Sequence, residues 1–230
     1  MIRQSSSDQS SSDIESNAVY QGQFGSFVID QRDRREVILY RLGLGIAALC
    51  FAVGVALTLS GLVSVDQAEI LTWLYAGMMV GLGISLWMIH IYMAVLHRAL
   101  QLFWAMGAIA SGAIAFSSPD PLWVTVYQQP LSIFGIGFGA AALTGIFFKE
   151  AFCFNRLETK ALTVIVPLLL LGHLAGWLPL SAERGLLATW AVLFAIFALR
   201  KAIQAIPPDI GDKSVFAYLK QQKLSNVSSP

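Results

Sequence analysis

Long apolar segments alternate with short polar turns along most of this chain, and six such segments can be counted. A helix needs roughly 20 apolar residues to cross a hydrocarbon core of about 30 Å, because each residue rises about 1.5 Å. The pattern therefore predicts about six transmembrane helices, at residues 42–65, 70–92, 100–116, 131–148, 161–182 and 185–199. The last is the shortest, and it extends to residue 206 if Arg200 and Lys201 reach the headgroups with their charged ends.

Composition and periodicity exclude two other architectures. The chain has 230 residues, of which 56% are hydrophobic and 13% charged, which is too apolar for a surface in contact with water. The segments lack the two-residue alternation of a membrane β-barrel, and each is about twice as long as a barrel strand. We therefore expect an all-α fold, a polytopic bundle of membrane helices.

Three regions follow from this pattern. Residues 1–33 are rich in Ser, Asp and Gln and are predicted to be a disordered, cytoplasmic amino-terminal segment. Residues 34–206 form the six-helix membrane domain, which Pro207 and Pro208 end. Residues 207–230 form a cytoplasmic tail, in which residues 212–223 could make a short amphipathic helix on the membrane surface.

The basic residues predict the orientation. If six spans are correct, both termini and two of the loops share one side of the membrane. That side holds fourteen of the fifteen basic residues, namely Arg3, Arg32, Arg34, Arg35, Arg41, Arg98, Lys149, Arg156, Lys160, Arg200, Lys201, Lys213, Lys220 and Lys223. Arg184 lies on the other side. Because short loops rich in Lys and Arg stay cytoplasmic, we expect both termini in the cytoplasm.

Glycine pairs at four-residue spacing indicate where helices pack. Lipid tails are as apolar as leucine, so membrane helices associate where small residues let their backbones approach closely. Three pairs place two glycines on one predicted helix face, and we expect them to form packing grooves: Gly77 and Gly81, Gly135 and Gly139, Gly172 and Gly176.

Motifs that carry catalytic chemistry are missing from the sequence. It contains no nucleophile elbow, P-loop, zinc-protease or dinucleotide-binding pattern, so we expect no enzyme and no catalytic residue. Cys50 and Cys153 have no second thiol at metal-ligand spacing, and no metal site is expected. The formal net charge of +1 argues against binding to nucleic acid.

The three histidines are the weak candidates for cofactor ligands. His90 and His97 are seven residues apart and would face the same way on a continuous helix, whereas His173 lies deeper in the fifth span. No cofactor is predicted, because a hydrogen-bonded histidine at a helix end is the simpler interpretation. Ligation of haem or chlorophyll through one of the three stays open as an alternative.

The densest group of polar and aromatic residues lies between the fourth and fifth spans. Together with a neighbouring basic residue, it could form an interfacial platform that contacts a partner protein or a lipid headgroup. The candidate contact residues are Arg98, Lys149, Glu150, Phe152, Cys153, Phe154, Arg156 and Glu158. A solvated basic loop explains the same pattern equally well.

The phrase from Phe148 to Phe154, followed by Arg156 and Glu158, resembles the signature of a small family of integral membrane proteins of unknown function, found in cyanobacteria and plant plastids. The resemblance covers roughly residues 34–207. It implies a thylakoid or plasma membrane, and it transfers no catalytic residue. The amino terminus does not resemble a transit peptide, which favours a bacterial member.

Three functional hypotheses remain at this point. The first is an accessory protein that aids the assembly or stability of a larger, photosynthetic membrane complex and contacts other membrane subunits besides the lipid bilayer. The second is a channel or transporter for a small neutral solute, because no span has a central charge and because Gly43 and Gly45 open the first span as Gly135 and Gly137 open the fourth. The third is a protein that binds haem or pigment.

Overall fold

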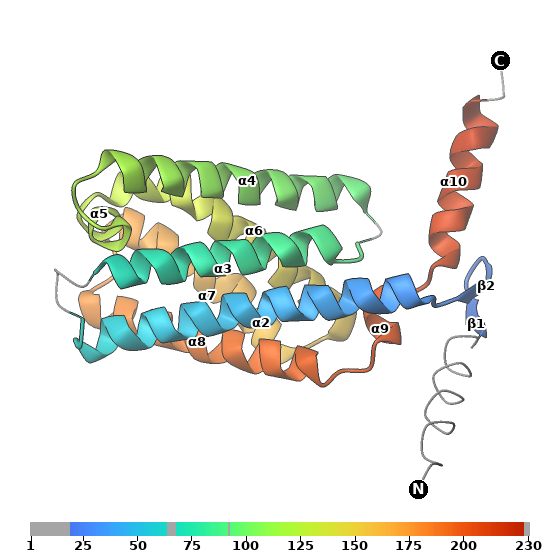
Figure 1. Cartoon of the computed structure of the whole chain (residues 1–230), viewed down its shortest axis with the longest axis horizontal. Helices are drawn as coiled ribbons and strands as arrows, with labels where there is room; N and C mark the ends of the chain where they lie inside the picture. The colour runs from blue at the N-terminus through green and yellow to red at the C-terminus, as the bar shows by residue number, and fades with distance from the viewer. Residues whose placement is uncertain (1–18, 64–67, 92, 228–230) are drawn as a thin grey trace, which may run out of the picture.

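Six long helices make up most of the protein. The computed structural model describes residues 19–63, 68–91 and 93–227. The long helices are α2 (Gln31–Ser60), α3 (Glu69–Met88), α4 (Ala94–Ser117), α6 (Ile133–Phe154), α7 (Leu157–Leu174) and α8 (Leu180–Ala202), which lie side by side in Figure 1. All six are long and apolar enough to cross a membrane. The prediction of an all-α bundle with six spans is therefore confirmed.

Short elements occupy the two ends of this bundle. They are β1 (Val19–Gly22), β2 (Gly25–Val28), α5 (Leu122–Gln128), the 3-10 helix η2 (Pro130–Ser132), α9 (Pro207–Ile210) and α10 (Ser214–Val227). The structure differs here from the predicted disorder of residues 1–33: residues 19–28 form an antiparallel hairpin, and α2 begins at Gln31. Residues 1–18 lie outside the described residues.

Local hydrogen bonds explain why these polar residues are ordered. Asp30 caps α2 by accepting a hydrogen bond from the Asp33 amide, and the Asp33 carboxylate accepts one from the Asp30 amide in return. The hairpin is held to the start of α10, because the Asp212 carboxylate accepts a hydrogen bond from the Gln23 amide at 2.6 Å. Asp212 also accepts a hydrogen bond from the Ser214 amide, at the first residue of this helix.

The bundle has two chemically different ends. We call the end where α2 begins and α8 finishes the basic end, and the end that carries α5 the opposite end. The hairpin, α9 and the start of α10 all lie at the basic end in Figure 1. Among the described residues, Arg184 is the one basic residue at the opposite end. The sequence-based partition of charges is thus a partition between two ends of the fold.

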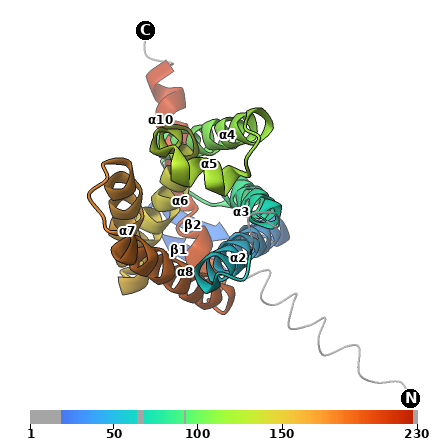
Figure 2. The same ribbon diagram turned by 90° about the vertical axis from the view of Figure 1, so that its left-hand side faces the viewer.

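The long helices form a closed ring that follows the order of the chain. Each helix packs against the next, and α8 packs against α2; Figure 2 looks along this ring from the opposite end. In an inverted repeat, a two-fold axis in the membrane plane relates the first three helices to the last three. If the first three followed one another clockwise around the ring, the last three would then follow one another anticlockwise. Because the observed sense is the same throughout, the structure does not support an inverted repeat of three plus three helices.

Close contacts between backbones fix neighbouring helices of the ring. A Cβ atom placed on Gly81 of α3 would lie 2.5 Å from the carbonyl oxygen of Gly43 in α2, and one on Gly77 would lie 2.9 Å from the sulfur of Cys50. On the other side of the ring, a Cβ on Gly107 of α4 would strike the backbone of Gly139 in α6. These contacts are so close that glycine is needed at Gly81 and Gly107.

The third glycine pair does not form a helix groove. Helix α7 ends at Leu174, and Gly176 has a left-handed backbone with φ of +65°, which ends the helix as glycine commonly does. A Cβ on Gly172 would meet the side chain of Leu178 in the following loop rather than another helix. The prediction that Gly172 and Gly176 share one packing face was therefore wrong.

Several predicted span limits also shift. The fifth span was expected to run to Ala182, but a loop follows Leu174 and α8 already begins at Leu180. Hydropathy cannot detect this break, because the loop residues are as apolar as the helices that they connect. The first and second spans were expected to end at Val65 and Tyr92, which lie outside the described residues, but α2 already ends at Ser60 and α3 at Met88.

Candidate functional site

A central cavity of about 580 Å³ lies inside the ring at its opposite end. Five of the six long helices and α5 contribute to its wall. On α2 the wall includes Cys50, Gly54 and Thr58, which recur every four residues and so share one helix face. The remaining lining is mostly apolar, with Met78 of α3 among the residues in contact with the space.

The mouth of the central cavity is polar. His173 of α7 and Glu183 of α8 both line it, and Nδ1 of the histidine lies 2.7 Å from Oε1 of the carboxylate. Tyr127 of α5 stacks on the imidazole with ring centroids 5.6 Å apart, and Arg184 also lines the mouth. Because a carboxylate only accepts hydrogen bonds, Nδ1 of His173 is the donor in this contact.

An aromatic plug closes the ring beneath the central cavity. Its residues are Phe147 of α6 and Phe194 and Phe197 of α8, which have no exposed surface. The ring of Phe147 meets those of Phe194 and Phe197 edge-on, at centroid distances of 5.3 and 5.7 Å. Phe51 connects the plug to the cavity, since it lines the cavity and packs on Trp190 and Phe194. Edge-to-face packing of this kind leaves little free space.

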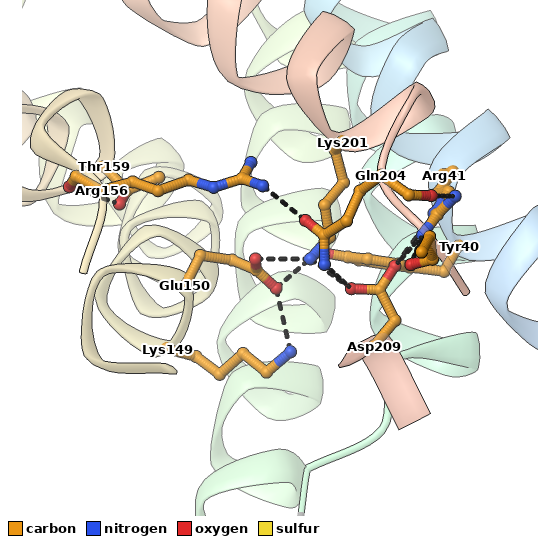
Figure 3. Close-up of polar contacts among 10 residues, drawn as sticks. Tyr40, Arg41, Lys149, Glu150, Arg156, Thr159, Lys201, Gln204 and Asp209 are labelled. Atoms are coloured by element: carbon orange, nitrogen blue, oxygen red, sulfur yellow. Dashed lines mark hydrogen bonds and ion pairs between the residues drawn. The ribbon is translucent and has the colours of Figure 1, made fainter. Parts of the chain in front are cut away.

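A buried ionic cluster follows beyond the plug, at the basic end. We define it as Glu150 of α6, Lys201 of α8 and Asp209 of α9, all drawn in Figure 3. The ammonium group of Lys201 donates to Oε2 of Glu150 at 2.6 Å and also pairs with Oδ1 of Asp209. The side chains of Glu150 and Lys201 have no exposed surface, and that of Asp209 is 2% exposed. Such buried charges require close partners, because removing them from water is costly.

Neighbouring groups complete the hydrogen bonding of Glu150. Lys149 donates to its Oε1 at 2.9 Å, and the hydroxyl of Tyr40 in α2 donates to the same oxygen at 3.2 Å. The ring of Phe154 lies 4.2 Å from the ammonium nitrogen of Lys201, which is cation–π distance. The carboxylate of Glu150 thus joins α2, α6 and α8 at one point of the basic end.

Arg41 holds Asp209 from the other side of the cluster. Its guanidinium donates to Oδ2 of Asp209 from Nε at 2.9 Å and from a terminal nitrogen at 2.7 Å. The same side chain donates to the carbonyl oxygens of Gln204 and Ala205, just after α8. The Gln204 side chain in turn accepts a hydrogen bond from Arg156, as Figure 3 shows. The cluster therefore fastens α2 to the chain that follows α8.

The candidate contact residues between the fourth and fifth spans divide into two sets. Phe152 is 84% exposed and Cys153 is exposed, as is Arg98 on α4. Glu150 and Glu158 are buried, and the Phe154 ring lies against Lys201. The prediction of one continuous platform was wrong for the two acids, because they turn inward to pair with cations. Lys149 and Arg156 likewise bond to the cluster and its surroundings.

The histidines are not grouped. The chain leaves helical structure between α3 and α4, so His90 and His97 do not lie on one continuous helix, contrary to the prediction. His90 lies 3.3 Å from Glu36, and His97 contacts the carbonyl oxygen of Leu86 at 2.6 Å. His173 is at the opposite end and is the histidine that lines the central cavity.

In the described part of the chain, no group of three or more His, Cys, Asp or Glu residues could hold a metal ion. Cys50 and Cys153 are free thiols. Of the three histidines, His173 is the one whose position could serve a cofactor inside the ring.

Lys201 and Asp209 were not predicted as site residues. The sequence does contain a signal that Lys201 and Glu150 are buried. Lys201 follows the buried residues Phe194 and Phe197 at helical spacing, and Glu150 follows Phe147 in the same way. Both charges therefore continue a buried face and should not be expected to point to the headgroups. Asp209 gives no comparable signal, because it belongs to the four-residue helix α9.

Comparison with protein-family models gives one finding. The model of a family described as "Uncharacterized integral membrane protein (DUF2301)" matches residues 84–218, which is more than half of the chain. The matched part includes the segment 148–158 on which the resemblance to a membrane family was based. Comparison with curated proteins and with solved structures finds no match.

Proposed function

This chain belongs to the DUF2301 family of integral membrane proteins, and from that premise we propose that it carries a small neutral, largely apolar solute through the membrane. The observation that carries the proposal is the central cavity of about 580 Å³ inside the ring of spans. Cavities of this size, with apolar walls and a few polar groups, are typical of small-molecule sites.

The order of features along the ring axis supports transport over mere binding. The central cavity, the aromatic plug and the ionic cluster follow one another from the opposite end to the basic end. A carrier needs a site that is open at one face and closed toward the other. The present conformation would be the one in which the solute site is open at the opposite end.

The wall of the central cavity favours a neutral solute. Its charged lining groups, Glu183 and Arg184, have opposite signs and belong to the first turns of α8, at the mouth. Deeper residues such as Phe51 and Met78 offer no partner to an ion, and an unpaired charge is costly in such surroundings. The second ring nitrogen of His173, Nε2, could form a hydrogen bond with a hydroxyl or amide of the solute.

We place the basic end in the cytoplasm, with both chain termini on that side. The support is the distribution of Lys and Arg, because short loops rich in these residues stay on the cytoplasmic side of the membrane. A plasma or thylakoid membrane fits the resemblance of the segment 148–158. The central cavity would then open to the periplasm or to the thylakoid lumen.

Solute flux into proteoliposomes tests the proposal. Vesicles with the full chain would be compared with empty vesicles for uptake of neutral diols and amides of increasing apolar length. Gly54→Phe should remove the additional uptake, because a Cβ on Gly54 touches only Leu74 and the ring extends the side chain into the cavity wall. Gly45→Phe on the same helix is the control, since no atom lies within 4 Å of its Cβ position and Gly45 does not line the cavity. Uptake equal to that of empty vesicles for every solute, or equal uptake by the two variants, would disprove the proposal.

A role as an assembly or stability factor for a larger membrane complex is the second candidate. It is favoured by the exposed aromatic and apolar side chains at the corner between α6 and α7, where Phe152 is 84% and Leu157 79% exposed. Co-migration with a complex on native gels tests it, with Phe152→Ser as the disrupting variant. A chain that migrates alone, in cells whose complexes are unchanged when it is deleted, would exclude this role.

A further inference from the structure

A second hollow, which we call the α3–α4 groove, lies on the outer side of the ring. Its volume is about 640 Å³, and its walls are formed by α3, by α4 and by the chain that follows α4. The contact between α3 and α4 is the least extensive in the ring, because α4 packs mainly on α6. Both walls belong to spans, so the open side of the groove faces the hydrocarbon of the bilayer.

The groove has the length of one leaflet. On α3 it runs from Glu69 at the opposite end to Val80 near the middle of the span, which corresponds to roughly 16 Å at a rise of about 1.5 Å per residue. One leaflet contributes about half of a hydrocarbon core of about 30 Å. At its inner end the groove is closed by Trp104 of α4, which donates to the carbonyl oxygen of Met79 at 2.7 Å.

Polarity changes along the groove as it does along an amphiphile. The carboxyl groups of Glu69 and Asp120 lie at its surface end, beside Ser118, whereas Ala108 and Gly112 line its deeper part. Carboxylates accept hydrogen bonds and repel anions, so the end near the membrane surface suits a hydroxyl head and not a phosphate. The deeper part suits a hydrocarbon chain.

Tyr75 and Leu122 line both the α3–α4 groove and the central cavity. The side chain of Tyr75 crosses between the two spaces, since its hydroxyl lies 3.6 Å from the position of a Cβ on Gly139 in α6. This hydroxyl is buried and makes no hydrogen bond of ordinary geometry in the described structure, although the Ser111 side chain is near enough to act on it. A buried hydroxyl that lacks a well-formed hydrogen bond gives up little when the side chain moves aside.

We propose that the α3–α4 groove is a lateral entrance to the central cavity, with Tyr75 and Leu122 as the movable partition. The proposal rests on the function proposed above and specifies its substrate class: a membrane-dissolved amphiphile with a hydroxyl head and an apolar body, taken from the leaflet at the opposite end. It enters from the lipid and passes Tyr75 to reach the wall formed by α2 and α7.

Photolabelling of the full chain in phosphatidylcholine vesicles tests this entrance. The probe is dodecanol with a diazirine midway along its chain, and labelled residues are identified by peptide mass spectrometry. Gly112→Trp fills the groove from α4, where no atom lies within 4 Å of the Cβ position, and Ala76→Phe fills it from α3. Gly45→Trp is the matched control on α2, with equally open surroundings outside both spaces.

We expect the wild type and Gly45→Trp to be labelled both in the groove and on the α2 wall of the central cavity, around Gly54. In Gly112→Trp and Ala76→Phe, labelling of the α2 wall should fall to the level seen with excess unlabelled dodecanol. Undiminished labelling of that wall in both variants would overturn the lateral entrance but leave the solute site intact. Labelling of the groove without any labelling of the α2 wall in the wild type would also overturn it, while the flux measurement decides the proposed function separately.

Discussion

Lys201 lies in the last turn of α8, and its ammonium group is enclosed by two carboxylates and the ring of Phe154. The desolvation of a buried ion pair is tolerated when every member keeps its partners, whereas removal of one partner leaves a buried charge uncompensated. Lys201 is central in this respect, because it alone bridges Glu150 and Asp209 among the described residues.

Replacing Lys201 by Met should therefore destabilise the protein strongly. We expect a loss of about 3 kcal/mol, at the lower limit for breaking a buried pair, because Lys149 and Arg41 still hold the two carboxylates. Thermal unfolding in detergent measures the effect. Arg32→Met is the control, since its pair with Glu36 is exposed and should contribute almost nothing.

The addition of Glu150→Gln to Lys201→Met should recover part of the lost stability, because it removes a buried negative charge that Lys201 no longer balances. A Lys201→Met protein that is as stable as the wild type would show that the ionic cluster does not stabilise the packing of the helices at the basic end.

His90 makes stability depend on pH. It lies outside the spans, and burial lowers its pKa below the ordinary value of about 6.5, although the carboxylates of Glu36 and Asp33 act in the other direction. The unfolded chain therefore binds this proton more readily than the folded one. The contribution of neutral His90 is complete above about pH 6.5 and is lost as the pH falls toward the lower pKa of the folded state.

Thermal unfolding at pH 7 and at pH 5 checks this sign. The melting temperature of the wild type should fall on acidification, and His90→Gln should reduce the fall. Lys149 and Lys213, which also act on the imidazole, are retained in both proteins. An equal fall in both proteins would mean that other groups cause the dependence.

At the scale of the helices, the contact between α2 and α3 depends on glycine. A Cβ on Gly81 would lie 2.5 Å from the Gly43 carbonyl oxygen and 2.8 Å from the Ala47 amide nitrogen, so the two backbones would have to separate. We expect Gly81→Ala to lower stability by about 1 to 3 kcal/mol, as overpacking does. Gly45→Ala, in open surroundings on α2, should leave stability unchanged or raise it slightly. Equal melting temperatures in detergent would contradict the close contact.

Hydropathy located the six spans but not the ends of their helices. It reports which residues prefer hydrocarbon, whereas helix ends are set by caps and by backbone geometry. The capping residue Asp30 starts α2 well before its apolar part, and left-handed Gly176 follows the end of α7 inside a continuous apolar run. Neither helix end coincides with a change from polar to apolar sequence.

For the molecule as a whole, the ring and its interior depend on contacts between distant segments. Glu150 meets Lys201 from 51 residues away and Tyr40 from 110 residues away. The sequence showed that Glu150 and Lys201 lie near span ends, but which span ends meet follows only from the packing of the helices in the ring. The central cavity could not be predicted for the same reason, because six elements contribute to it.

The central cavity and the ionic cluster are linked mechanically through α8. The plug residue Phe194 and the cluster residue Lys201 lie on one face of α8, so any movement of this helix acts on both. Opening toward the basic end would require the bonds of Lys201 to Glu150 and Asp209 to break. The same bonds keep the present conformation closed on that side.

Labelling of the two native cysteines tests this account most directly. Cys153 is exposed at the basic end, whereas Cys50 lines the central cavity, about 15 Å below the end of α2 at a rise of about 1.5 Å per residue. A small, membrane-impermeant methanethiosulfonate would be applied to either side of sealed vesicles that contain Cys50→Ser or Cys153→Ser chains. The account predicts that Cys50 reacts from one side and Cys153 from the other, and that Gly54→Phe protects Cys50. Reaction of both thiols from the same side, or no reaction of Cys50 from either side, would contradict it.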